Sequence, residues 1–132
     1  MASELRVNTL KDASGNNSVA TSVVAQGSAK AWVNFNGTGT IAIRESFNTS
    51  SLTDNGTGDY DSNLTNSMSN ADFSVGATTS FLTGVTHMVH FVPDGADGNN
   101  LASAISGVTR RTDSNNLTDL NYIMLQAFGD LA

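Results

Sequence analysis

The chain has 132 residues, a length that supports one hydrophobic core and is short for two. Its formal net charge of −6 argues against sequence-independent binding to the phosphate backbone of nucleic acids and against docking on anionic lipid. The absence of cysteine excludes a disulfide framework and a thiolate metal site.

The composition favours strands over helices. Charged residues make up 14%, below the roughly 25% typical of globular domains, and 16 Ser, 15 Thr, 15 Asn and 12 Gly take their place. Ser, Asn and Gly weaken helices, whereas Thr suits strands. The N-terminus lacks a basic segment followed by an apolar stretch, and no run approaches the ~20 apolar residues of a membrane span. We therefore expect a product that is made and retained in a cytoplasm, without membrane insertion.

The first 28 residues have the pattern of an extended arm. Apolar and polar side chains alternate over residues 5–10, which predicts a short strand. A polar turn at 12–17 separates this strand from a second one predicted over residues 19–24. Such an amphipathic strand is not stable alone, so residues 1–28 are predicted to pair with a neighbouring subunit or to dock on their own domain.

The predicted domain, residues 29–132, opens with a hairpin. Residues 31–35 alternate between two faces, and residues 41–47 form a partner strand across a turn at 36–39. Asn-Gly between two alternating runs is the strongest short-range signal for a hairpin.

Further strands follow, with polar turns between them. Residues 85–92 are apolar on both faces, which predicts a central buried strand that ends at Pro93. The other predicted strands are 59–64, 73–79, 102–110 and 122–128, and the predicted connections are 54–58, 94–100 and 112–119. These elements predict an all-β fold: a single antiparallel β-sandwich, of jelly-roll or immunoglobulin-like type, with an extended N-terminal arm.

The two histidines, His87 and His90, are three residues apart. On a strand this spacing places them on opposite faces, so one chain cannot bring both to one metal ion. We interpret them as one packed and one hydrogen-bonded side chain.

Two acidic groups are candidate cation ligands. Asp94, Asp97 and Asn99 resemble a calcium loop, but their spacing departs from the EF-hand pattern. Asp59 and Asp61 share one face of a strand, which also suits a bound cation. Surface turns carry such carboxylates routinely, so we predict no metal site and no cofactor.

Residue patterns typical of catalysis are missing from the sequence. No serine lies in a G-x-S-x-G elbow, and the glycine-rich turns lack the Lys-Ser/Thr of a P-loop. Glutamate occurs only at Glu4 and Glu45, so a glycosidase pair would need aspartates that nothing distinguishes. We predict no catalytic residues and no enzymatic activity.

Two surface features have alternative interpretations. Arg110-Arg111 is the only adjacent basic pair, and we favour a solvated strand end over contact with an acidic patch on a neighbour. Trp32 lies on the face opposite Ala31, Val33 and Phe35. It is either a core residue of a second sheet or an aromatic anchor at a subunit interface.

Residues 29–48 read Ala-Lys-Ala-Trp-Val-Asn-Phe-Asn-Gly-Thr-Gly-Thr-Ile-Ala-Ile-Arg-Glu-Ser-Phe-Asn, and residues 52–60 read Leu-Thr-Asp-Asn-Gly-Thr-Gly-Asp-Tyr. This stretch resembles a module of tail-fibre-like and other virion structural proteins of tailed phages, especially those of marine bacteria. The opening at residues 5–12 and the closing Phe128-Gly-Asp are similar to the same family. The resemblance implies a virion component, and it carries over no functional residue.

The strands, the neutral polar surface and the arm fit a part that assembles symmetrically, so we predict a homotrimer that contacts other virion proteins. Two locations on the virion fit this prediction. A length of 132 residues favours a capsid decoration or cement protein, whereas the opening sequence favours a tail-fibre-like appendage. The alternative function is a carbohydrate-binding module that recognises a glycan on the host surface. It would need clustered exposed aromatic side chains, and aromatic residues make up only 7%.

Overall fold

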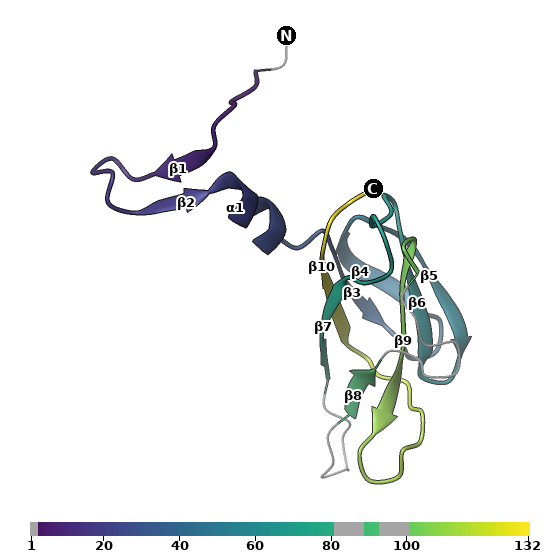
Figure 1. Cartoon of the computed structure of the whole chain (residues 1–132). Coiled ribbons are helices and arrows are strands. Elements are labelled where there is room, and N and C mark those ends of the chain that lie inside the picture. The colour runs from purple at the N-terminus through teal and green to yellow at the C-terminus, as the bar shows by residue number, and fades with distance from the viewer. Residues whose placement is uncertain (1–2, 81–88, 93–100) are drawn as a thin grey trace.

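The computed structural model describes residues 3–80, 89–92 and 101–132, with the segment 89–92 described by its backbone alone. Within these ranges, eight strands form two four-stranded antiparallel sheets in a β-sandwich-like arrangement, and a hairpin and one short helix precede them (Figure 1). The predicted mostly-β, antiparallel fold is confirmed.

The first sheet contains the predicted hairpin. Its strand order is β4 (Ala42–Phe47), β3 (Ala31–Asn36), β10 (Ile123–Phe128) and β7 (Ser74–Thr79). Between β3 and β4, the Asn36 Nδ2 donates to the Thr38 carbonyl oxygen at 2.7 Å, and its Oδ1 accepts from the Thr38 backbone N–H at 3.2 Å. Asn36 therefore closes the turn with its own side chain.

The second sheet has the order β5 (Thr49–Gly56), β6 (Asp59–Leu64), β9 (Ala104–Arg111) and β8 (Val89–Val92). Strands β6 and β9 lie within two residues of their predicted ranges. Of the strand predicted over 85–92, only β8 lies within the described residues, and the loop predicted at 94–100 lies outside them.

The arm differs from its prediction. It contains a hairpin of β1 (Thr9–Lys11) and β2 (Ser18–Ala20), followed by the helix α1 (Thr21–Gly27). The strand predicted over 19–24 is thus wrong beyond Ala20, and the strand predicted over 5–10 begins only at Thr9. The ladder between β1 and β2 ends at Ala20, and from Thr21 the backbone groups pair within the helix α1.

Strand β5 was not predicted, because it has almost no apolar alternation. Its eight residues, Thr-Ser-Ser-Leu-Thr-Asp-Asn-Gly, are largely exposed at the edge of the second sheet. Pairing with β6 determines its conformation, and one-residue register shifts interrupt that pairing twice. The strand is therefore a product of tertiary structure and not of local sequence.

The hydrophobic core lies between the two sheets. The inward face of β3 contributes Ala31, Val33 and Phe35, as the alternation predicted. The ring of Phe35 contacts that of Tyr60 on β6 edge to face, with 5.4 Å between ring centroids. The other members of the core cluster are Leu64, Met68, Phe73, Ile105, Leu120, Ile123, Leu125 and Ala127. Every buried side chain of the described residues lies in the range 31–127, so the arm adds nothing to this core.

The Tyr60 hydroxyl connects three turns of the sandwich. It lies 2.8 Å from the Gly37 carbonyl oxygen and 2.8 Å from Asp119 Oδ1, which also accepts the Gly58 backbone N–H at 2.7 Å. Burial raises the pKa of the Tyr60 hydroxyl well above its usual range, and the neighbouring Asp119 carboxylate raises it further.

Asn48 forms the corner at which the chain passes from the first sheet to the second. It adopts a left-handed conformation, with φ 56°. Its Nδ2 donates to the carbonyl oxygens of Lys30 and Asn66, each at 3.0 Å, and its Oδ1 accepts the Asn66 backbone N–H at 2.7 Å. Asparagine suits both the backbone conformation and the hydrogen bonds.

Alkaline pH should test the Tyr60 contacts. Because the pKa of the hydroxyl is higher in the folded chain, its stabilising contribution is complete below the unfolded pKa of about 10 and is lost as pH rises above it. Urea unfolding at pH 8 and pH 11 should show a steeper loss of stability for the wild type than for Tyr60→Phe. At pH 8 the variant should be less stable by about 1 kcal/mol. Equal slopes for the two chains would contradict this role.

Substitutions at Asn48 should separate backbone strain from lost hydrogen bonds. Asn48→Gly loses only the side-chain hydrogen bonds and should cost about 1–2 kcal/mol. Asn48→Ala also forces an alanine into the left-handed region, which should add about 1 kcal/mol. The free energy of unfolding in urea measures both costs. Equal values for the two variants would show that the corner relaxes.

Candidate functional site

The acidic pair predicted on one strand is confirmed as a pair on one face. Asp59 and Asp61 alternate with buried residues along β6. The Asn55 Nδ2 donates to Asp61 Oδ2 at 3.0 Å and reaches Asp59 Oδ1 at 3.5 Å, so an amide group from the same chain lies between the two carboxylates. Within residues 3–80, 89–92 and 101–132, no three His, Asp or Glu side chains gather as metal ligands.

Of the other candidate metal ligands, only His90 lies within the described residues. His90 lies on β8 in register with Arg110 of β9. His87, Asp94, Asp97 and Asn99 lie outside the described residues.

The arginine pair turns back on its own chain. Arg111 forms a bidentate ion pair with Asp113, with Nε–Oδ1 and Nη2–Oδ2 distances of 2.9 and 2.5 Å. The Arg110 Nη1 donates to the Asn115 carbonyl oxygen at 3.1 Å. Both guanidinium groups therefore hold the turn after β9.

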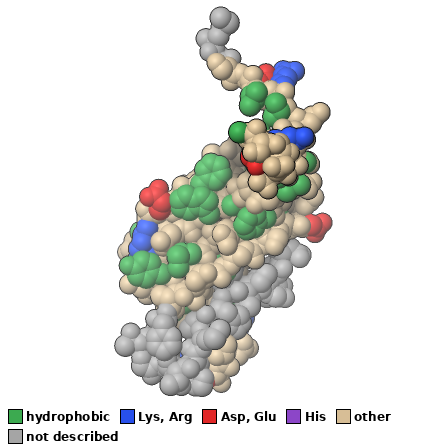
Figure 2. Space-filling view, turned by 90° about the vertical axis from the view of Figure 1, so that its left-hand side faces the viewer, with side chains coloured by type: hydrophobic (Ala, Val, Ile, Leu, Met, Phe, Trp, Pro, Cys, Tyr) green, Lys and Arg blue, Asp and Glu red, His purple; other side chains and the backbone are tan. Residues whose placement is uncertain are grey.

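The outer face of the first sheet carries large exposed side chains. Trp32 on β3 is 37% exposed and lies opposite Phe47 on β4, which is 53% exposed. Tyr122, 43% exposed, and Met124, 38% exposed, follow on the neighbouring strand β10 and its approach. We call Trp32, Phe47, Tyr122 and Met124 the aromatic face. Apolar side chains gather on this side of the sandwich (Figure 2). Trp32 is therefore not a core residue of a second sheet.

A β-bulge determines which residues of β4 reach this face. The register with β3 shifts between Asn34 and Phe35, so Ile43 lies opposite buried Phe35, whereas Glu45 and Phe47 lie opposite outward-facing residues. A bulge reverses the alternation along the bulged strand. Strict alternation from Ile43 would place Phe47 on the inward face, so the exposure of Phe47 could not be predicted from the sequence pattern.

Arg44, the residue inserted at the bulge, holds one end of the aromatic face in place. Its Nη1 donates to the Asn121 carbonyl oxygen at 2.5 Å and its Nη2 to Asn121 Oδ1 at 2.6 Å. Its guanidinium carbon lies 3.9 Å from the centroid of the Tyr122 ring, a cation–π contact. The Arg44 guanidinium thus covers one side of the Tyr122 ring, and its ring contact within the described residues is with Tyr122 and not with Trp32 or Phe47.

Polar groups lie between the two ends of the aromatic face. In one row across the sheet, Glu45, Asn34 and Met124 are in register. The Asn34 Oδ1 is buried and has no hydrogen-bond partner within the described residues. A buried acceptor without a hydrogen-bond partner costs free energy of folding.

The N-terminal arm is the second candidate surface. Its hairpin and helix extend away from the sandwich (Figure 1). Five large apolar side chains in the described part of the arm are exposed: Leu5 at 79%, Val7 at 39%, Leu10 at 44%, Val23 at 58% and Val24 at 45%. A run of uncovered apolar side chains marks an interaction surface more often than chance exposure does.

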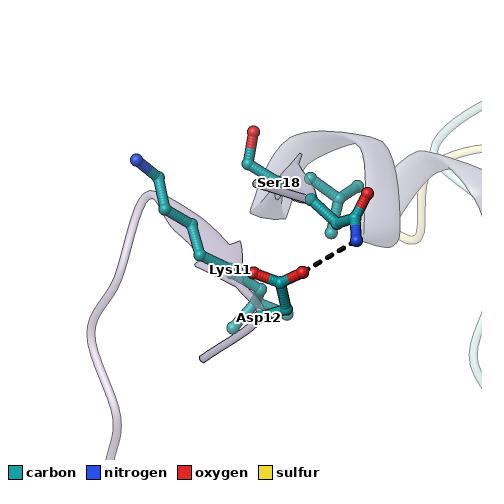
Figure 3. Close-up of a pocket in the computed structure, with 6 residues that line it drawn as sticks. Lys11, Asp12 and Ser18 are labelled. Atoms are coloured by element: carbon teal, nitrogen blue, oxygen red, sulfur yellow. Dashed lines mark hydrogen bonds between the residues drawn. The ribbon is translucent and has the colours of Figure 1, made fainter. Parts of the chain in front are cut away.

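The arm hairpin also encloses an open hollow. Its volume is about 310 Å³, and residues from both strands and the turn line it (Figure 3). Leu10 of β1 and Val19 of β2 are register partners in this ribbon. The turn is held by the Asn17 Nδ2, which donates to Asp12 Oδ2 at 2.7 Å. The described residues thus present two apolar surfaces, the arm and the aromatic face.

Comparisons of the chain with models of protein families, with curated proteins and with solved structures find no match. The described residues contain no helix that is long and apolar enough to cross a membrane.

Proposed function

We propose that the chain is a non-enzymatic structural component on the surface of a tailed-phage virion, and that it assembles as a symmetric homotrimer through its N-terminal arm. The observation that carries this proposal is the arm itself. It presents five large apolar side chains to solvent, and none of its described residues, 3–28, is buried. A segment of this kind becomes stable when another molecule covers it.

The arm lacks the means to be stable alone. Helix α1 has seven residues, no side-chain N-cap and no buried residue, whereas isolated helices shorter than about 12–15 residues are marginal in water. Strands β1 and β2 have three residues each, and a lone two-stranded hairpin is likewise marginal. A partner that covers the arm would supply the missing packing.

The proposed location on a virion is supported by the resemblance of residues 29–48 and 52–60 to tail-fibre-like modules. Within that proposal, the decoration or cement protein and the tail-fibre-like appendage are both retained, and so are the jelly-roll and immunoglobulin-like topologies of the sandwich. Other virion proteins are the proposed partners besides the chain itself. Assembly in the host cytoplasm and the absence of nucleic-acid and membrane binding belong to the same proposal.

Removing the arm should abolish self-association without unfolding the domain. A chain of residues 29–132 should sediment as a monomer and keep its β-type circular dichroism, because every buried side chain of the described residues lies in the range 31–127. In the full chain, Val24→Asp on α1 should also weaken the oligomer. Leu101→Asp, at a residue 57% exposed on the body, is the matched control and should leave it intact. An oligomer that survives both arm changes would contradict the proposal.

Labelling intact particles should locate the chain. Antibodies against it should bind purified virions, because a surface component is accessible without disruption. Hundreds of copies over the shell would identify a decoration protein, and a few copies at the tail would identify an appendage. Particles that contain no copy would contradict the virion proposal.

A second candidate function is recognition of a host-surface glycan, and one observation favours it. Trp32, Phe47 and Tyr122 are exposed on the same face of one sheet. Aromatic rings offer flat apolar platforms, and polar side chains beside them fix the orientation of a ligand. Asn34 and Glu45 lie in the adjoining row of the sheet. Although aromatic residues make up only 7% of the chain, three of them are exposed together on this face, as a glycan site requires.

Intrinsic fluorescence should test glycan binding directly, because Trp32 is the only tryptophan. A neutral oligosaccharide that stacks on this face should shift the Trp32 emission, and Phe47→Ala should weaken the binding. Leu101→Ala, which removes a comparable exposed side chain elsewhere, is the control. Emission that stays constant across a panel of neutral oligosaccharides would exclude this second function.

A further inference from the structure

The hollow of the arm hairpin is a shallow, widely open depression in which an apolar side chain could lie, and Leu10 and Val19 form part of its lining. No buried residue of the described chain lies in this region, and Leu10 remains 44% exposed. An apolar group that entered the hollow would remove these side chains from water.

Phe47 is the most exposed aromatic side chain among the described residues of the body. It lies at the end of β4, beside Trp32 across the sheet, with 53% of its surface accessible. The side chains of Trp32, Phe47 and Tyr122 together expose on the order of 300 Å², if each exposes about 150–250 Å² when fully accessible. That area is well below the roughly 800 Å² per partner of a standard interface. Two aromatic faces stacked on each other would therefore make a small contact, and an additional element is needed to enlarge it.

Charge favours the arm as that element. Residues 1–28 carry Glu4, Arg6, Lys11 and Asp12, two acidic and two basic side chains, so their net charge is zero. Residues 29–132 carry the other 10 acidic and 4 basic side chains, a net charge of 4 − 10 = −6. Two copies of the acidic body, residues 29–132, repel each other electrostatically. A neutral arm approaches an acidic body without this repulsion.

One pair of opposite charges accompanies the apolar surfaces. Lys11 extends from β1 at the edge of the hollow (Figure 3). Glu45 lies two residues before Phe47 on β4. In the part of the chain that the structure describes, neither side chain has an ion-pair or hydrogen-bond partner. Each surface thus has an apolar group and an unpaired charge that complement those of the other.

We infer that the β1–β2 hairpin of one copy docks on the aromatic face of a second copy, with Phe47 in the hairpin hollow and Lys11 paired with Glu45. The contact forms between copies because the hairpin extends away from the sandwich, with α1 between it and the body (Figure 1). In a closed ring each copy gives one hairpin and receives one, so every hairpin hollow and every aromatic face is occupied. This inference rests on the proposed function, because it names the surface that receives the arm.

Charge reversal in the full chain tests the pairing. Lys11→Glu and Glu45→Lys should each weaken self-association by about three- to tenfold per contact, because an ion pair becomes a like-charge repulsion. The double variant restores the pair with reversed signs and should return to near the wild-type value. Arg6→Glu makes the same change in charge elsewhere on the arm, and it should neither weaken the oligomer as much nor rescue Glu45→Lys. Sedimentation velocity measures the wild type, the three single variants and the two double variants, Lys11→Glu/Glu45→Lys and Arg6→Glu/Glu45→Lys.

The accessibility of Trp32 supplies a second measurement. Acrylamide should quench its fluorescence less in the oligomer than in diluted monomer, and Phe47→Ala should reduce that protection together with association. Leu101→Ala should leave both unchanged.

Three outcomes would overturn the inference. If the double variant associates no better than the weaker single variant while removal of the arm still abolishes assembly, the arm docks elsewhere and the proposed function stands. If the full-length wild type is a monomer at all accessible concentrations, the proposed function fails as well. If Trp32 is shielded only when a neutral oligosaccharide is added, the aromatic face is a glycan site.

Discussion

The side chain of Tyr60 connects both sheets of the sandwich to the turns that surround it. Its ring packs on Phe35 of the opposite sheet, and its hydroxyl lies between the carbonyl oxygen of Gly37 and the carboxylate of Asp119. Asp119 in turn accepts the backbone N–H of Gly58, in the turn between β5 and β6. Space around this group is tight: a Cβ added at Gly37 would lie 2.7 Å from the Tyr60 hydroxyl oxygen. The hairpin turn of the first sheet and the approach to β10 are thereby fixed to the second sheet.

The aromatic face depends on this arrangement. Asp119 and Leu120 lead directly into Asn121 and Tyr122, so the contacts that hold Asp119 also position the start of β10. Arg44 then reaches across from β4 to Asn121 and covers one side of the Tyr122 ring. The aromatic face is consequently built on the neighbouring strands β4, β3 and β10, with a bulge, a cation–π contact and the hydrogen bonds of Arg44 determining which side chains point outward.

The body and the arm differ in what stabilises them. The body has a core between two sheets and holds its connections with buried and side-chain hydrogen bonds. The arm has a seven-residue helix, a three-residue hairpin ladder and exposed apolar side chains. Because the arm is neutral and the body is acidic, contact between arm and body avoids the repulsion that contact between two bodies would meet. This asymmetry is the physical basis for proposing assembly through the arm.

The sequence by itself determined the strands whose apolar side chains alternate. The alternation over 31–35 and the Asn-Gly turn predicted β3 and its hairpin partner, and β6, β7 and β10 lie close to their predicted ranges. Only the tertiary structure decided the rest. Strand β5 forms because β6 pairs with it, although its own residues are polar. Residues 21–27 form a helix where the sequence predicted a strand, and Phe47 points outward because a bulge inserts Arg44 into β4. Alternation reports the preference of one segment for one face, whereas pairing partners and bulges depend on segments far apart in the chain.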